Sequence, residues 1–407
     1  MTFIESLLLL LVLSRVLGEI AGRFGQPAML GEIAAGILLG PSCFSLIHYT
    51  ADIKAIADIG VLLLVFMAGM EMDLPALWDL FRGRRVWVSA AGFVVPLLAG
   101  IMVGYLFGLD NTRIVFVGLC IAITALPVSV RILMDLGKLH TDIGQKIVSA
   151  AVANDVASLL ALGIILDVNG APANIEGFLL SIGKSLGKAL LFMVVVAIAA
   201  RLIRRYSPSR IFRSPSIEKF LGKLKGRESR FAIVLLFVIA FASFSEFLGL
   251  DFVVGAFFGS MLLTHEALGP QVFDQIEETA SSVTVGFLGP IFFAAIGLQF
   301  NASTLRDWGL MVAILLTSFA GKILGGYIGG RLARMGQTES WALGFGLNGR
   351  GLMELVIASV ALANGFIGEQ LFTILVLMAV LTTFLTPVFL KSAYARLEAL
   401  NVPAQSS

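Results

Sequence analysis

Charged residues are scarce in this chain. Only 14% of its 407 residues are Asp, Glu, Lys or Arg, whereas a soluble domain carries about 25%. The net charge of +2 is also too small for a surface that binds nucleic acid, so we expect no nucleic-acid partner. With 58% hydrophobic residues, the composition excludes an ordinary water-soluble protein and indicates one that lies in the lipid bilayer.

Cysteine and histidine are equally few. The two cysteines, Cys43 and Cys120, both lie inside apolar runs, which favours free thiols over a disulfide. The three histidines, His48, His140 and His265, stand singly, so the spacing of a zinc site is lacking. We find no catalytic constellation either. We therefore expect no enzyme, no cofactor and no metal beyond a transported alkali cation.

What the chain does contain is a nearly continuous series of apolar runs. Each is about 20 residues long, the length that a helix needs to cross a bilayer, and the mean hydropathy is +0.94. The first run starts without a basic leader, so we interpret it as a spanning helix and not as a removable signal. The expected fold class is an all-α polytopic membrane protein with about 13 transmembrane helices. We predict these helices at Phe3–Ala21, Ala28–Phe44, Lys54–Met70, Arg85–Phe107, Arg113–Leu133, Ile143–Leu166, Ile175–Arg201, Arg230–Leu248, Asp251–His265, Ala280–Leu298, Trp308–Arg331, Trp341–Asn364 and Phe366–Lys391.

Basic residues in the predicted connections set the orientation. If the chain crosses the membrane at each predicted helix, they gather on one side, which the positive-inside rule places in the cytoplasm. The N-terminus is then outside and the C-terminus is cytoplasmic. One connection on the basic side is acidic, but acidic residues count little in this rule. Its residues are Glu266, Asp274, Glu277 and Glu278; the basic residues include Arg82, Arg84, Arg85, Lys138, Lys146, Arg331, Arg334, Arg396 and the stretch from Arg204 to Arg227.

The long basic connection also suggests how the chain is organised. It separates two sets of six predicted helices, as expected for a transporter built from two inverted repeats. We predict a first repeat at 1–166 that includes half of the ion-transport core, a linking helix and basic cytosolic connection at 167–229, a second repeat at 230–392, and a C-terminal tail at 393–407.

A carboxylate stands in the middle of the sixth predicted helix. Asp155 is about twelve residues from its start, or roughly 18 Å, which is close to the bilayer midplane. Such a carboxylate is costly unless it faces a partner or a water-filled cavity, although it could also simply brace a neighbouring helix. One carboxylate can hold a proton or a desolvated alkali cation but not readily both, so this competition is itself an exchange mechanism. Asn154 adds an amide oxygen without a second titrating charge.

A lysine lies equally deep in the eleventh predicted helix. Lys322 is about fourteen residues from the start of this helix, too deep to reach the membrane surface easily. It therefore needs an anionic partner, and Asp155, Glu354 and Glu71 are the candidates. A structural ion pair and a functional role account for Lys322 equally well.

Two predicted helices carry breaks at matching places. In the fifth, Pro127 follows Thr124 and removes a backbone donor. The twelfth holds a polar, glycine-rich break ahead of Glu354, which consists of Asn348, Gly349, Arg350 and Gly351. The fifth and twelfth helices are equivalent if the first six repeat as the last six. Paired interruptions at equivalent positions point to a transport site.

Several motifs follow one another along the whole chain. They are GQPAMLGEI at 25–33, GILLGPS at 36–42, LLLVFMAGME at 62–71, Asn154-Asp155, GAF at 255–257 and PIFFAAIG at 290–297. In this order they resemble the monovalent cation:proton antiporter superfamily. The branch is the one with glutathione-gated potassium efflux systems, NapA-like bacterial sodium/proton antiporters and plant cation/proton exchangers.

The resemblance implies two inverted six-helix repeats with crossed discontinuous helices, a separate dimerisation region and thus a homodimer, and a place in the bacterial inner membrane. It implies that Asp155 carries the cation and the proton, and that Thr124 and nearby carbonyls help to coordinate the cation. Lys322 falls where the family has a basic residue facing this site. Arg350 and Glu354 would then be supporting charges.

The implied activity is secondary active antiport of K⁺ or Na⁺ against H⁺ by alternating access. Strongly electrogenic relatives carry two adjacent carboxylates, whereas here the first is Asn154, which favours electroneutral exchange unless Lys322 also titrates. Residues 348–355 are more similar to potassium-type plant and fungal exchangers. The nucleotide-binding domain of the potassium efflux systems is not in this sequence, so a separate cytosolic regulatory subunit remains open.

Two other functions remain as alternatives. A ligand-gated potassium efflux system that works like a channel would need a continuous polar pathway. A sodium-coupled carrier of organic anions would need a ten-helix plan with polar sodium-binding clusters, which the sequence does not display.

Overall fold

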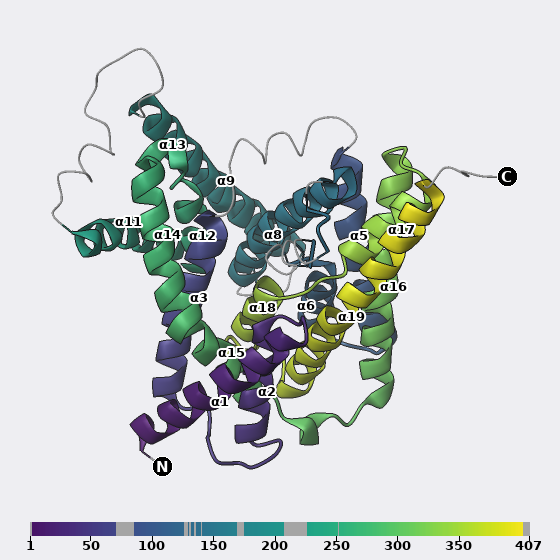
Figure 1. The fold of residues 1–407 in the computed structure, drawn as a ribbon, viewed down its shortest axis with the longest axis horizontal. Coiled ribbons are helices and arrows are strands. Elements are labelled where there is room, and N and C mark those ends of the chain that lie inside the picture. Colours follow the sequence, from purple (N-terminus) through teal and green to yellow (C-terminus); the bar gives the residue numbers. More distant parts are fainter. Residues whose placement is uncertain are drawn as a thin grey trace. The chain divides into compact units, whose positions relative to one another are not determined.

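The computed structural model of the chain describes residues 2–70, 85–125, 129, 132–133, 136–139, 141–168, 175–206, 226–250 and 252–401, and these residues form helices and connections without any strand. Figure 1 shows their arrangement. The elements are α1 (Phe3–Arg23), α2 (Ala28–Leu39), α3 (Ala51–Met70), α5 (Arg85–Leu106), α6 (Asn111–Ala122), α8 (Asp142–Val168), α9 (Ile175–Tyr206), α11 (Arg227–Phe247), α12 (Phe252–Met261), α13 (His265–Leu268), α14 (Pro270–Val283), the π-helix η1 (Thr284–Leu288), α15 (Gly289–Gln299), the 3₁₀ turn η2 (Ala302–Thr304), α16 (Trp308–Leu332), α17 (Gln337–Gly346), α18 (Leu352–Ala363) and α19 (Glu369–Asn401).

Many of these helices suit a bilayer. Within the described residues, six helical segments are long and apolar enough to cross a membrane, and four further apolar helices, α2, α6, α12 and most of α18, are shorter. The predicted all-α membrane class is therefore confirmed. The count of thirteen crossings and the inverted repeats stay predictions.

The chain forms two compact units. The first consists of Met1–Thr50, Leu77–Ser158 and Phe293–Ser407, and the second of Ala51–Ala76 and Leu159–Phe292. Each unit thus combines segments that lie far apart in the sequence. The predicted division at 1–166, 167–229, 230–392 and 393–407 follows the chain and not its compactness, and it stays a prediction. The last helix continues to Asn401, past its predicted end at Lys391.

Small residues let helices of the first unit approach closely. Helix α16 lies beside α5 (Figure 1), and its glycines recur every four residues on the side that faces α5. A Cβ atom added at Gly325 would lie 2.7 Å from the carbonyl oxygen of Ala91, and one at Gly329 would lie 2.9 Å from that of Trp87. The backbones are therefore in direct contact, as in other membrane helix pairs.

The second unit is held by apolar and small side chains. Helix α3 packs on α12 and on the π-helix η1, and a Cβ atom at Gly60 would lie 2.8 Å from the carbonyl oxygen of Leu288. Phe192 of α9 meets Phe258 of α12 edge-on, with 5.9 Å between the ring centroids.

The structure corrects one predicted connection and the ends of two predicted helices. The predicted acidic connection is instead helical. Pro270 begins α14, and Phe273, Ile276 and Ala280 give this helix a buried face. Of the acidic residues, Asp274, Glu277 and Glu278 lie on α14 and Glu266 lies on α13. The second helix ends at Leu39 and not Phe44, because Gly40 is extended and Pro41 follows it. The ninth ends at Met261, before Thr264 begins the short α13.

We predict that Gly36→Ala destabilises the first unit, because a Cβ atom at Gly36 collides with the carbonyl oxygen of Ala294 on α15. Overpacking of this kind costs about 1–3 kcal/mol, so thermal unfolding in detergent should begin at a lower temperature. Gly22→Ala is the matched control, since a Cβ there meets nothing within 4 Å. Equal unfolding temperatures for both variants would contradict the close contact.

Candidate functional site

Two helices of the first unit stop where their backbones meet. Helix α6 ends at Ala122, and Ile123 is extended, with φ −71° and ψ 145°. Between α17 and α18 the chain is non-helical from Leu347 to Gly351. We call these segments, Ile123–Ala125 and Leu347–Gly351, the helix crossing. They are joined by a backbone hydrogen bond of 2.9 Å from the Ala125 amide to the Gly349 carbonyl oxygen.

Thr124 is at the centre of the helix crossing. Its hydroxyl group is fully buried and donates to the carbonyl oxygen of Leu347 at 3.0 Å. The hydroxyl oxygen of Thr124 also accepts hydrogen bonds, from Asn154 Nδ2 at 3.3 Å and from Lys322 Nζ at 2.7 Å. A hydroxyl oxygen has two lone pairs, so both are already engaged by these donors. Thr124 thus connects α6, α8, α16 and the break before α18.

Lys322 places its charge at the end of α6. The side chain is fully buried on α16, and among its contacts are hydrogen bonds to the carbonyl oxygens of Ala122 and, at 3.1 Å, Gly92 of α5. The last carbonyl groups of a helix lack intrahelical partners and carry the negative end of its dipole. An ammonium group is therefore favourable here, deep in an apolar bundle.

Arg350 also places its positive charge at the end of α6, from the facing segment Leu347–Gly351. It is fully buried, and its guanidinium donates to Cys120 O at 2.5 Å and to Ile121 O at 2.9 Å. It also forms an ion pair of 3.4 Å with Glu354, four residues on in the first turn of α18. Three successive carbonyl groups at the end of α6 thus receive donors from two buried cations.

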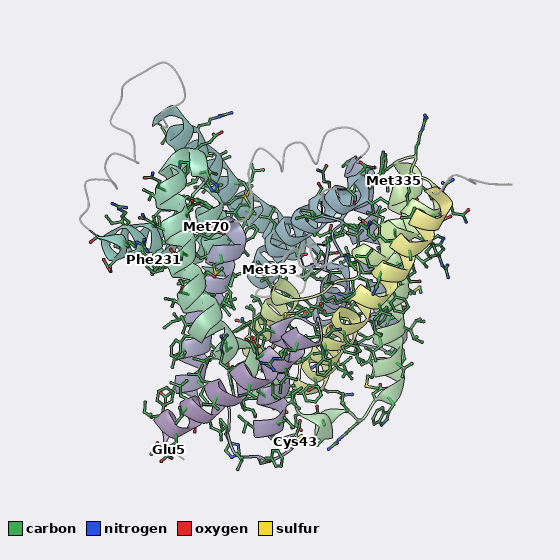
Figure 2. All side chains as sticks on the ribbon, in the orientation of Figure 1. Glu5, Cys43, Met70, Phe231, Met335 and Met353 are labelled. Atoms are coloured by element: carbon green, nitrogen blue, oxygen red, sulfur yellow. The ribbon has the colours of Figure 1, made fainter. Side chains whose placement is uncertain are left out.

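Two buried acceptor atoms at the helix crossing have no partner among the described residues. They are Asn348 Oδ1 and Glu354 Oε1. The other polar atoms of these side chains are used, since Asn348 Nδ2 donates to Thr386 Oγ1 at 3.4 Å and Glu354 Oε2 accepts from Arg350. Buried polar atoms normally have partners, so a water molecule, a cation or a side chain outside the described part of the chain has to supply them. Met353, which is labelled in Figure 2 and precedes Glu354 in the sequence, is buried.

Asn154 and Asp155 follow one another on α8. Asn154 is buried, with 1% of its surface exposed, and its carbonyl oxygen accepts from Ser158 Oγ at 2.6 Å. The backbone of Asp155 is part of the same helix, one residue beyond the contact with Thr124. The side chain of Asp155 and the whole of Pro127 and Glu71 lie outside the described residues.

The structure thus brings most of the predicted site residues together. Thr124, Asn154 and Lys322 share one set of hydrogen bonds, while Asn348, Gly349, Arg350 and Gly351 form the facing segment. Glu354 was one of the predicted partners of Lys322, but it forms its ion pair with Arg350 instead. Sequence reasoning predicted the helix α19 but missed its contribution to the site, where Thr383 donates to the Arg350 carbonyl oxygen at 2.7 Å. Three threonines just before a proline in an apolar run, Thr382, Thr383 and Thr386, were the available signal.

Comparisons with known proteins extend these observations. A family model described as sodium/hydrogen exchanger, transmembrane, matches residues 7–393. The chain is 30% identical to the probable Na⁺/H⁺ antiporter GerT of Bacillus cereus, covering 97% of this chain and 100% of the relative. It is 28% identical to the Na⁺/H⁺-K⁺ antiporter GerN of the same organism, covering 96% of each. The fold is similar to that of the sodium proton antiporter MjNhaP1 from Methanocaldococcus jannaschii, with TM-score 0.72 and 16% identity over 99% of both chains.

We predict that Arg350→Met strongly destabilises the first unit. It removes the donors to Cys120 and Ile121 and leaves Glu354 without its buried partner, and breaking a buried pair from one side costs about 3–5 kcal/mol. The measurement is thermal unfolding in detergent, with Lys391→Met, an exposed cation of α19, as control. Adding Glu354→Leu should recover part of the loss. An unfolding temperature of Arg350→Met equal to that of the control would rule out this role.

Proposed function

Because the chain belongs to the sodium/hydrogen exchanger family of transmembrane proteins, we propose that it exchanges a monovalent cation, K⁺ or Na⁺, for protons across a membrane. Membership of this family confirms the prediction, made from the motifs, that the chain belongs to the monovalent cation:proton antiporter superfamily. The observation that carries the proposal is the helix crossing, where a threonine, an asparagine and two cations are buried together. A polar cluster of this kind inside an apolar bundle is costly, and it marks a substrate or proton pathway.

Asp155 is the group that we assign to bind the cation and the proton in turn. It follows Asn154, whose amide donates to Thr124 at the crossing, so its backbone is already at the site. A carboxylate holds a desolvated alkali cation or a proton but not readily both, and this competition couples the two fluxes. Alternating access then carries the loaded carboxylate from one side of the membrane to the other.

Lys322 and Thr124 determine when a cation can enter. Both lone pairs of the Thr124 hydroxyl are engaged by Lys322 and Asn154, so a cation that binds this oxygen must first displace one of them. We infer that Lys322 moves aside and retains its hydrogen bonds to the carbonyl oxygens of Ala122 and Gly92. Only Asp155 then changes its charge, and the exchange of one cation for one proton is electroneutral.

The choice of cation and the setting of the protein are also proposals. The GerN relative is named as an antiporter of Na⁺, H⁺ and K⁺. The similarity of residues 348–355 to potassium-type exchangers favours potassium. We propose a homodimer in the bacterial inner membrane, with the N-terminus outside and the C-terminus in the cytoplasm. A separate cytosolic regulatory subunit could dock on the basic connection, of which residues 207–225 lie outside the described part.

We predict that Asp155→Asn abolishes exchange, because asparagine has the same shape but cannot hold a proton. The measurement is the internal pH of proteoliposomes after K⁺ or Na⁺ is added outside. Asp142→Asn is the matched control on the same helix, since Asp142 is 69% exposed and pairs with Lys146. The rate of Asp155→Asn should fall to that of protein-free vesicles while Asp142→Asn keeps the wild-type rate. Wild-type exchange by Asp155→Asn would show that the proton is carried elsewhere.

We also predict that an imposed membrane potential leaves the rate of exchange unchanged. A transport cycle that moves one net charge gains about 2.3 kcal/mol from 100 mV, which would drive uphill exchange visibly. The measurement compares pH changes in proteoliposomes with and without the potential, in the presence of equal cation concentrations. Potential-driven proton movement that requires the protein would mean that Lys322 releases a proton as well, and would refute one-for-one exchange.

A further inference from the structure

An open cavity with four charged lining residues lies between α1 and α2. Its volume is about 630 Å³, which is in the usual range of small-molecule sites, about 300–1,000 Å³. None of its lining residues belongs to the helix crossing. Its charged lining residues are Arg15, Glu19 and Arg23 of α1 and Glu32 of α2.

Glu32 forms the buried wall of this cavity. Only 5% of its surface is exposed, and its carboxylate lies against Gly18 of α1, where an added Cβ atom would be 3.5 Å from Glu32 Oε1. Arg15 is the cation whose charge acts on this carboxylate. At the outer rim, Arg23 Nε contacts Glu19 Oε1 at 3.3 Å, and both side chains are exposed.

The charged lining residues lie within about 12 Å of the turn between α1 and α2, measured along the helices. Helices α1 and α2 form a hairpin that turns between Arg23 and Ala28, at the opposite end of α1 from Glu5 (Figure 2). Arg15 is eight residues before Arg23 and therefore about 12 Å below the turn, and Glu32 is about 6 Å below it. The polar region on each side of a bilayer is about 5–7 Å thick. With the turn at the membrane surface, as the predicted topology places it, the cavity extends from the headgroup layer about 5–7 Å into the hydrocarbon.

An apolar stripe continues from the cavity along α1. Leu8, Val12, Val16 and Ile20 recur every four residues, and between 44% and 63% of the surface of each is exposed. Val16 and Ile20 also line the cavity. A ligand that fills the cavity and follows this stripe must have a polar head and an apolar chain.

We propose that the cavity binds the headgroup of a bilayer phospholipid with a phosphate and a primary ammonium, of the phosphatidylethanolamine type. Arg15 and Arg23 bind the phosphate, and Glu32 and Glu19 bind the ammonium. The two cations and two carboxylates match a zwitterion, whereas a purely anionic head leaves Glu32 facing negative charge. A quaternary ammonium lacks the N–H donors that a buried carboxylate needs. The proposal does not depend on the transport function.

The test measures lipid binding to the delipidated full-length protein by native mass spectrometry. The probes are phosphatidylethanolamine, phosphatidylcholine and phosphatidylglycerol with identical acyl chains. The wild type should bind phosphatidylethanolamine at least about tenfold more tightly than the other two. Glu32→Gln should lose this preference, while Glu246→Gln, at an exposed glutamate of α11, should keep it. A preference that survives Glu32→Gln, or its absence from the wild type, overturns the proposal.

A second pair of variants tests the cavity without altering any charge. Gly22 lines the cavity and a Cβ atom there meets nothing within 4 Å, so the side chain of Gly22→Leu starts in open space and is expected to occupy part of the cavity. Gly187→Leu is the control, because a Cβ at this glycine of α9 also meets nothing within 4 Å. Only Gly22→Leu should weaken binding, by at least about tenfold.

The competing occupant of this face is a second copy of the chain. Val16→Cys in a Cys43→Ser background would then form crosslinks between chains in native membranes. Such crosslinks, or wild-type lipid binding by Gly22→Leu, would overturn the proposal. Absence of crosslinks through Val16→Cys under oxidising conditions supports it.

Discussion

The first unit depends on the pairing of buried cations with the open end of a helix. Three carbonyl oxygens at the end of α6, those of Cys120, Ile121 and Ala122, accept hydrogen bonds from Arg350 and Lys322. In lipid, an unsatisfied backbone group costs several kcal/mol because no water can replace the missing partner. A helix can therefore stop in the middle of an apolar bundle only where other side chains supply donors. Everything else at the crossing follows from this requirement.

The same pairing explains why the site is polar without being unstable. Burying either cation alone would carry a large desolvation cost. Each lies beside the partial negative charge at the C-terminal end of α6, which comes from the backbone and needs no ionised side chain. Glu354 balances Arg350 from the first turn of α18, where the positive helix end also favours a carboxylate. Thr386 and Thr383 of α19 form hydrogen bonds with Asn348 and Arg350 of the opposite segment. Of the groups that we assign to the site, Asp155 is then the one that must change its charge during transport.

Local sequence signals predicted the helices better than the contacts. Helices α1, α5 and α16 were predicted to within two residues, because apolar length alone defines them, and the glycines at 349 and 351 marked the break before α18. The acidic stretch was mistaken for a connection because hydropathy averages hide the narrow buried face of α14. The four-residue spacing of Arg350 and Glu354 is enough to predict that their side chains meet. No local pattern predicts that Arg350 donates to the carbonyl oxygen of Cys120, which is 230 positions away in the sequence. Such long-range partners are set by the fold.

That sequence distance has a consequence for how the protein is made. The partners of the α6 carbonyl oxygens lie between 200 and 230 residues further along the chain. At about 5–20 residues per second, a ribosome needs roughly 10–40 s to reach them after α6 has emerged. During that interval the end of α6 must be kept hydrated or shielded by the insertion machinery. The first half of the protein therefore cannot mature on its own, and membrane assembly is completed only when the last helices arrive.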